Sequence, residues 1–155
     1  MARPDLEAIQ PQPVPRIRLS FNAELSELAP ASERIRSFLS EHGIDKDALF
    51  AIDMVIEEIA TNSIKYGFNG MQKGIITMEA AATATHAELV IEDDGRAFNP
   101  TEAPDPDVNR PLEEMPIGGL GIHLVRALTD DFDYQRVNDC NRVRVSVHRK
   151  KQTEK

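Results

Sequence analysis

The segment EEIATNSIKYGF, residues 57–68, closes a long stretch of sequence that has the apolar spacing of an α-helix. Asp45 or Asp47 could cap the start of this helix, and Gly67 follows its last predicted residue. The apolar stripe that would face the protein core consists of Leu49, Ile52, Ile56, Ile59 and Ile64. The sequence therefore predicts a long amphipathic helix that ends at Tyr66.

A second face of the same helix carries polar side chains. Glu58 and Asn62 are four residues apart and Lys65 follows three later, so all three lie on one face that is distinct from the apolar stripe. A carboxylate, an amide oxygen and an ammonium group on one rigid surface suit a site for Mg²⁺ and phosphate. An ordinary solvated helix face has the same composition, so this segment leaves both interpretations open.

Two further segments carry residues that suit nucleotide binding. In VIEDDGRAFNP (90–100) a predicted strand ends at Asp93, and a buried carboxylate there needs hydrogen-bond donors such as an adenine amino group, although a plain turn has similar residues. In IGGLGIHLV (117–125) glycines precede a helix, where backbone N–H groups can approach phosphate oxygens. No lysine follows as in a Walker A loop, and no strand leads into the glycines as in a Rossmann fingerprint.

The order of these three segments is more specific than any one of them. E-x-x-x-N-x-x-K-Y, D-x-G-x-x-F-N-P and G-G-L-G-I-H-L-V resemble the N, G1 and G2 boxes of the GHKL ATPases, which have the Bergerat fold. The compact form is most similar to the anti-sigma-factor serine-protein kinases of bacterial partner-switching systems, and the resemblance spans about residues 16–150. It implies a two-layer α/β (α+β) sandwich, in which about three helices cover a mixed, mostly antiparallel sheet of about five strands.

The resemblance also implies roles for individual residues. Glu58 would be the catalytic general base, and Asn62 would ligate Mg²⁺ and contact the nucleotide. Asp93 would bind the adenine amino group. The other expected ATP-binding positions are Lys65, Tyr66, Gly95, Phe98, Gly118, Gly119, Leu120, Gly121, Ile122, His123 and Asn141. Considered by itself, His123 is more typical of a packing or surface residue.

Composition limits the class of protein. The chain has 155 residues, with 26 acidic and 18 basic side chains and a net charge of −8, which argues against direct binding of nucleic acid. The single cysteine, Cys140, is expected in a turn between two strands and favours a reducing compartment. No apolar run has the length of a membrane helix or the character of a signal peptide, so the expected location is the cytoplasm.

Proline positions predict the domain limits. Four prolines in the first fifteen residues indicate a loose tail at 1–15, and the basic residues 151–155 read as a second tail. Five prolines between Pro100 and Pro116 indicate a long loop at about 99–118, which the resemblance identifies as the ATP lid. The ATP-binding domain would occupy 16–150. Its predicted strands lie at 16–21, 74–82, 87–93, 132–137 and 142–149, with a turn at Thr85–His86, and its helices lie at 24–41, 45–66 and after the glycines.

Three functions compete at this point. The resemblance implies an anti-sigma factor that is also an ATP- and Mg²⁺-dependent serine/threonine-protein kinase, which phosphorylates a STAS-domain anti-sigma-factor antagonist, sequesters a sigma factor and forms a homodimer. The alternative is a nucleotide-dependent binding module with little or no phosphoryl transfer, although the presence of Glu58 favours the enzyme. A histidine-kinase catalytic domain is a third interpretation, but we expect the proline-rich residues 1–15 before the first strand to be too few to supply a phospho-accepting helix pair.

Overall fold

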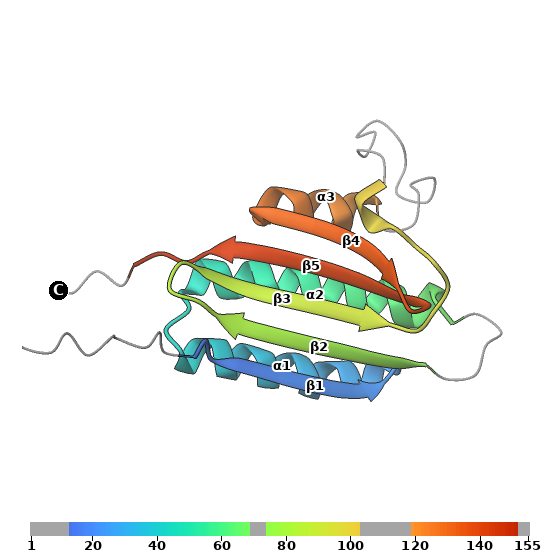
Figure 1. Ribbon diagram of the computed structural model, residues 1–155, viewed down its shortest axis with the longest axis horizontal. Helices are drawn as coiled ribbons and strands as arrows, with labels where there is room; N and C mark the ends of the chain where they lie inside the picture. Colours follow the sequence, from blue (N-terminus) through green and yellow to red (C-terminus); the bar gives the residue numbers. More distant parts are fainter. Residues whose placement is uncertain (1–12, 69–73, 103–118, 152–155) are drawn as a thin grey trace, which may run out of the picture.

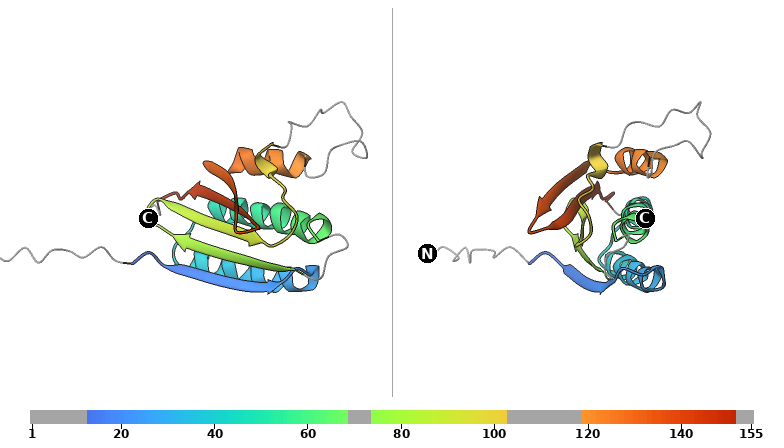
Figure 2. Two further views of the ribbon diagram at one scale, coloured as in Figure 1. Left: turned by 45° about the vertical axis from the view of Figure 1, so that its right-hand side comes forward. Right: turned by 90° about the vertical axis from the view of Figure 1, so that its right-hand side faces the viewer.

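The computed structural model describes residues 13–68, 74–102 and 119–151, which form one layer of helices packed on one β-sheet (Figures 1 and 2). The strands are β1 (Arg16–Asn22), β2 (Ile75–Ala82), β3 (His86–Asp93), β4 (Asp131–Val137) and β5 (Cys140–His148). The helices are α1 (Leu25–Glu41), α2 (Lys46–Tyr66) and α3 (Gly119–Leu128), with a short 3₁₀ helix η1 (Pro100–Glu102). The predicted two-layer architecture is confirmed.

The sheet has the strand order β1-β2-β3-β5-β4, and each of its four neighbouring pairs is antiparallel. The predicted number of strands and their mostly antiparallel pairing are confirmed, and the described strands contain no parallel pair. All three helices lie on the same face of the sheet, and α2 lies between the other two (Figure 2). This arrangement puts the C-terminal part of α2, which carries Asn62 and Ser63, beside the end of β3 and the start of β5.

The core lies between the two layers. Alternate residues of β2 and β3 are buried against the helices, which is the period-two pattern of a sheet with one covered face. Helix α2 contributes the largest buried stripe, and Ile52 and Ile56 are each 1% exposed. Each such side chain stabilises the fold by about 1.5–3 kcal/mol. This burial fixes the rotation of α2 about its axis and thereby the direction of its polar residues.

The start of α2 is held by local and distant contacts. Asp45 is the residue that caps the helix, because its Oδ2 accepts a hydrogen bond of 3.2 Å from the Ala48 N–H. Gly43 has φ of 82°, which allows the tight connection from α1 to α2. After β5, the Arg149 guanidinium donates to the backbone carbonyls of Gly43 and Thr83 at 2.9 and 3.0 Å. The end of the described chain thus ties the α1–α2 turn to the β2–β3 turn.

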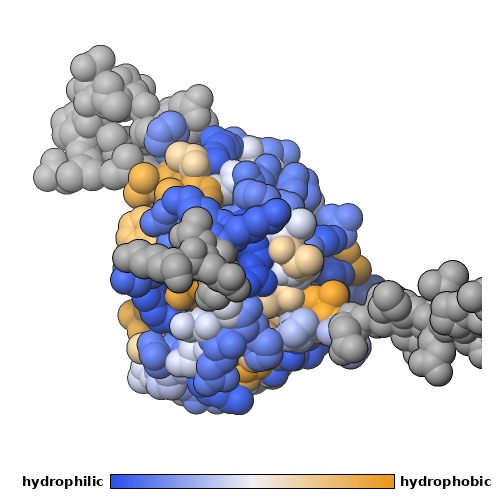
Figure 3. All heavy atoms as spheres, turned by 90° about the vertical axis from the view of Figure 1, so that its left-hand side faces the viewer, coloured by the Kyte–Doolittle hydropathy of each residue, from blue (hydrophilic) through white to orange (hydrophobic). Residues whose placement is uncertain are grey.

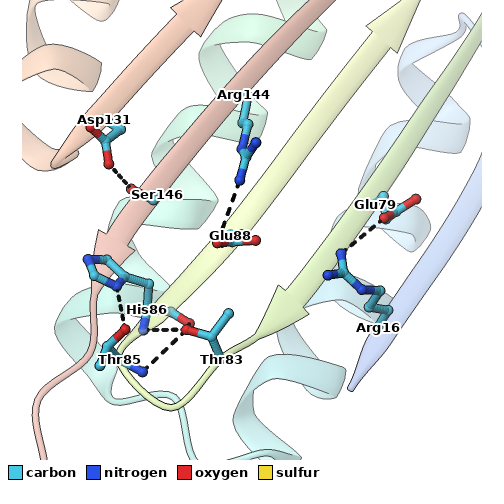
Figure 4. Close-up of polar contacts among 9 residues, drawn as sticks. All are labelled: Arg16, Glu79, Thr83, Thr85, His86, Glu88, Asp131, Arg144 and Ser146. Atoms are coloured by element: carbon cyan, nitrogen blue, oxygen red, sulfur yellow. Dashed lines mark hydrogen bonds and ion pairs between the residues drawn. The ribbon is translucent and has the colours of Figure 1, made fainter. Parts of the chain in front are cut away.

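Two turns differ from the sequence prediction. Asn138 and Asp139 have φ of 51° and 60°, as in the two-residue hairpin turns that match strand twist. Cys140 is therefore the first residue of β5, paired with Val137, and the prediction that it lies in the turn is wrong. His86 likewise belongs to β3, where it pairs with His148 of β5. The turn ends before it, and the Thr83 hydroxyl accepts hydrogen bonds from the backbone N–H groups of Thr85 and His86 (Figure 4).

The face of the sheet that is turned away from the helices is polar. Arg144 pairs with Glu88 and Arg16 pairs with Glu79 across neighbouring strands (Figure 4). Exposed pairs of this kind contribute about 0–1 kcal/mol each, so they mark a solvated surface more than a source of stability. The end of the molecule that holds the β2–β3 turn is also mainly hydrophilic (Figure 3).

Candidate functional site

The site is built around a buried carboxylate. Asp93 is the last residue of β3, and only 6% of it is exposed. The Ser63 hydroxyl of α2 donates to its Oδ2 at 2.9 Å, while the Gly95 N–H and the Asn141 Nδ2 donate to its Oδ1 at 3.0 and 2.9 Å. These donors compensate the loss of hydration that burial imposes on a carboxylate. A carboxylate has about four acceptor positions, so the donors in the described part of the chain leave one position on Oδ2 unused.

Asn141 connects this carboxylate to the segment that follows β3. It is buried at the start of β5, directly opposite Asp93 in the sheet. Its Nδ2 also donates to the Arg96 carbonyl at 2.6 Å, and its Oδ1 accepts from the Phe98 N–H at 3.1 Å and from the Tyr134 hydroxyl at 2.6 Å. One side chain therefore fixes both the carboxylate and the backbone from Arg96 to Phe98.

A close backbone approach joins the end of α2 to the turn after Asp93. The Arg96 N–H donates to the Gly67 carbonyl at 2.9 Å, and a Cβ added to Gly95 would lie 2.8 Å from that same oxygen. On the other side, the Arg136 guanidinium donates to the Gly95 carbonyl at 2.9 Å. Gly95 is thus required because the neighbouring backbone leaves no room for a side chain.

A pocket of about 220 Å³ opens onto Asp93. Its lining residues come from α2, the segment after β3 and β5, and they are Ile59, Asn62, Ser63, Tyr66, Gly67, Asp93, Arg96, Ala97, Phe98, Pro100, Asn141 and Val143. The volume is below the roughly 300–1,000 Å³ of most small-molecule pockets, so the described residues enclose space for part of a nucleotide. Apolar walls around one buried acceptor fit a flat base that carries an amino group.

Two aromatic side chains of this lining are unusually exposed. Tyr66 is 44% exposed and Phe98 is 45% exposed, although large apolar groups are normally covered. Aromatic rings at the mouth of a pocket provide flat apolar surface for a ring-shaped ligand. Their exposure therefore agrees with the fit of a base beside Asp93.

A second polar pair on α2, Glu58 and Asn62, adjoins the pocket, because Asn62 itself lines it. The Asn62 Nδ2 donates to Glu58 Oε1 at 2.9 Å, which leaves the Asn62 amide oxygen without a hydrogen bond among the described residues. An amide oxygen is a suitable ligand for Mg²⁺, which binds few protein groups and keeps several waters. In the described ranges, no group of three or more His, Cys, Asp or Glu side chains could hold a metal ion.

Glu58 has the environment of a proton acceptor. Partial burial raises the pKa of its carboxyl above the ordinary value, and the charge of Glu57 acts in the same direction. The hydrogen bond from Asn62 and the charge of Lys65 oppose this rise in pKa. Across the gap to α3, a Cβ added to Gly121 would overlap the Glu58 carboxylate. The carboxylate is therefore packed against the first turn of α3.

The structure brings most of the predicted positions together. Asn62, Tyr66, Asp93, Phe98 and Asn141 line the pocket, Gly95 adjoins it, and Glu58 lies next to Gly121. Among the remaining predicted residues, Ile122 is fully buried in the core, His123 is exposed on α3, and the backbones of Gly119 and Leu120 begin α3. Gly118 and most of the predicted lid, residues 103–118, lie outside the described residues, as do 1–12 and 152–155 of the predicted tails.

Lys65 occupies a different surface from the pocket. Its exposed side chain lines a groove between α1 and α2, together with Arg36 and Asp53. The next residue along α2, Tyr66, does line the pocket, but successive residues of a helix lie about 100° apart around its axis, so Lys65 projects toward the α1 side. A shared helix face therefore does not bring Lys65 to the pocket around Asp93.

Two important site residues were not predicted from the sequence. Ser63 follows Ile59 by four residues and so lies on the buried side of α2, where a hydroxyl needs a partner; this position was the available signal. Tyr134 gave no such signal, because its contact with Asn141 depends on the exact register of the β4–β5 hairpin.

Comparison with known proteins agrees with this geometry. The model of a family described as "Histidine kinase-like ATPase domain" matches residues 21–147. The chain is 29% identical over 120 residues to the serine-protein kinase RsbW of Listeria monocytogenes, which covers 75% of this chain and 76% of that protein. It is 24% identical over 115 residues to the anti-sigma F factor of Halalkalibacterium halodurans, covering 74% and 79%.

A solved structure shares the fold. The structure of the RsbU and RsbW domains of Rv1364c from Mycobacterium tuberculosis aligns with a TM-score of 0.58 at 15% identity. The alignment covers 88% of this chain but only 33% of that one, so this chain spans about a third of the solved protein's length. In the described residues, no helix combines the length and apolar character that a membrane crossing requires.

Proposed function

Because the chain belongs to the histidine kinase-like ATPase domain family, we propose that it binds ATP at Asp93 and transfers the γ-phosphoryl group to a serine or threonine of a partner protein. This membership confirms the resemblance indicated by the three sequence segments. The observation that carries the proposal is the buried Asp93 carboxylate, which lines the same pocket as Asn62, the hydrogen-bond partner of Glu58.

Each group of the site has one proposed task. Bound Mg²⁺–ATP supplies the phosphoryl group and neutralises charge that develops during its transfer. Asp93 accepts a hydrogen bond from the base, and the Asn62 amide oxygen, which accepts no hydrogen bond from the described residues, would ligate the metal ion. Glu58 accepts the proton of the attacking hydroxyl, for which its raised pKa is suited because a general base works best near the operating pH. The glycines at the start of α3 face the phosphates.

The relatives' names support the kinase class and an anti-sigma role, since one is a serine-protein kinase and another an anti-sigma F factor. We propose that the substrate is a STAS-domain anti-sigma-factor antagonist and that the chain sequesters a sigma factor when this antagonist is phosphorylated. The proposal places the chain in the cytoplasm, where sigma factors act, and includes a homodimer. The net charge of −8 argues that control of transcription passes through protein partners and not through direct contact with nucleic acid.

The experiment combines binding and transfer. Purified chain is titrated with ATP and Mg²⁺ by calorimetry, then incubated with labelled ATP and the STAS-domain protein encoded nearest to it. We expect binding, transfer of label, and a loss of transfer of about a hundredfold or more in Glu58→Gln. Glu57→Gln is the matched control, because that neighbouring carboxylate is exposed and lies on the groove side of α2.

The outcomes separate the possible functions. Absence of heat on titration with ATP would overturn nucleotide binding. Binding without transfer of label, with Glu58→Gln indistinguishable from the parent, would exclude the kinase and support the nucleotide-dependent binding module instead.

A further inference from the structure

We propose that Tyr134, which does not line the pocket, is a positioning residue for recognition of the nucleotide base. Through Asn141 it holds the Asp93 carboxylate so that one acceptor position faces the base. This inference rests on the proposed function, because it concerns how the ATP pocket distinguishes the base. Neither the sequence nor the family match assigns a role to Tyr134.

The amide of Asn141 has only one workable orientation. It makes all four hydrogen bonds that an amide allows, with two acceptor bonds at Oδ1 and two donor bonds at Nδ2. Turning the amide over would place its oxygen against the Asp93 carboxylate and the Arg96 carbonyl. It would also place its NH₂ group against the Phe98 N–H. The network around Asn141 therefore determines which group it presents to Asp93.

The contacts of Asp93 leave its two oxygens in different states. Oδ1 accepts from both Gly95 and Asn141, so its two acceptor positions are filled. Among the described residues, Oδ2 accepts only from the Ser63 hydroxyl, at 2.9 Å, and the single hydrogen of that hydroxyl is shared with the Ile59 carbonyl at 3.0 Å. The under-used acceptor is therefore Oδ2, and it selects a base that presents an amino group over one that presents a carbonyl or hydrogen.

Tyr134 stabilises this hydrogen-bond network from a position that does not line the pocket. It lies on the edge strand β4, opposite Val143 of β5, and its half-buried ring packs against the core. Its hydroxyl donates to Asn141 Oδ1 at 2.6 Å, shorter than the 3.1 Å bond from the Phe98 N–H to the same atom. Phenylalanine at this position would keep the ring packing and remove only the hydrogen bond.

The test compares two nucleotides. ATP and purine riboside triphosphate, which lacks the 6-amino group, are titrated with Mg²⁺ into the parent, Tyr134→Phe and Ser146→Ala. Ser146 is the matched control, because its hydroxyl donates to Asp131 at 2.8 Å across the same two strands, away from the pocket (Figure 4). We expect Tyr134→Phe to lower the affinity for ATP about threefold to tenfold, which is the loss typical of one hydrogen bond, and to leave the affinity for the analogue unchanged.

A second readout needs no nucleotide. Hydrogen exchange of the Phe98 amide should accelerate in Tyr134→Phe and stay unchanged in Ser146→Ala, because Asn141 holds that amide. If the parent binds no ATP, both the proposed function and this inference are wrong. If the parent binds ATP but Tyr134→Phe weakens both nucleotides equally, or neither, the inference alone is overturned and the proposed function stands.

Discussion

Replacement of Gly121 by alanine should separate catalysis from stability. The added Cβ would overlap the Glu58 carboxylate, which is the end of a flexible side chain, so the carboxylate can move aside while the backbone stays in place. The move breaks the 2.9 Å bond from Asn62, a loss of about 0.5–1.5 kcal/mol. Alanine is about 1 kcal/mol more favourable than glycine within a helix, and α3 is helical at this position.

These two terms nearly cancel, so the free energy of unfolding should change by less than about 1 kcal/mol. For a chain of this size that corresponds to a shift in Tm of no more than about 4 °C. Phosphoryl transfer should nevertheless fall about a hundredfold or more, because a displaced general base loses its contribution to the rate. Single-turnover transfer of label and thermal denaturation of the same preparation measure the two quantities.

The control is the double variant with Glu58→Gln. If Gly121→Ala acts through Glu58, it should cause no further loss of transfer in that background, since residues that act as a unit are not additive. Transfer at the parent rate would refute the reasoning. A drop in ATP affinity of equal size in both backgrounds would also refute it, because Gly121 would then be needed for the phosphates and not for the position of Glu58.

Three further predictions follow from single side chains. The pKa of the Glu58 carboxyl is raised in the folded state, so between the ordinary and the raised pKa the folded state binds more protons than the unfolded state, and the free energy of unfolding falls as pH rises through this window. Glu58→Gln should therefore be more stable than the parent at pH 7 and equally stable below about pH 4, as measured by chemical denaturation. Arg149→Ala removes donors to backbone carbonyls of two turns and should lower the unfolding free energy by about 1–3 kcal/mol without changing ATP affinity; an unchanged midpoint in urea would contradict this. The Thr61 hydroxyl is buried with no partner among the described residues, so Thr61→Val should leave stability unchanged or raise it by up to about 1 kcal/mol, and a clear loss in thermal denaturation would contradict this.

The sequence predicted the elements that depend on local periodicity. The spacing of isoleucines from Ile52 to Ile64 indicated α2, and the structure ends this helix at Tyr66 as expected. The predicted burial of Asp93 at the end of a strand also agrees with the structure. Such features follow from a repeating pattern of apolar residues, so a single chain contains enough information to place them.

Contacts that depend on the distance between elements could not be predicted in this way. Lys65 lies on nearly the same helix face as Glu58, but this face meets different neighbours at the two positions: Glu58 lies next to Gly121 of α3, whereas Lys65 borders the groove beside α1. Cys140 was assigned to the wrong side of a strand boundary, because a two-residue turn and a four-residue turn fit the same sequence equally well. Only the paired register of β4 and β5 decides between them.

The same distinction explains where the site is sensitive to change. Asp93 and Asn62 have polar side chains whose chemistry follows from their residue type, so a sequence motif is enough to predict their roles. The effects of Gly121 and Tyr134 depend on the distance between two elements. Gly121 leaves room for the Glu58 carboxylate of α2, and the Tyr134 hydroxyl reaches the Asn141 amide of the neighbouring strand. A glycine acts here by the absence of a Cβ, and a tyrosine acts by one hydroxyl at 2.6 Å. Substitutions at these two positions are therefore the strictest tests of the geometry. Gly121→Ala should displace the Glu58 carboxylate and Tyr134→Phe should loosen the Asp93 carboxylate, although both carboxylates are still present.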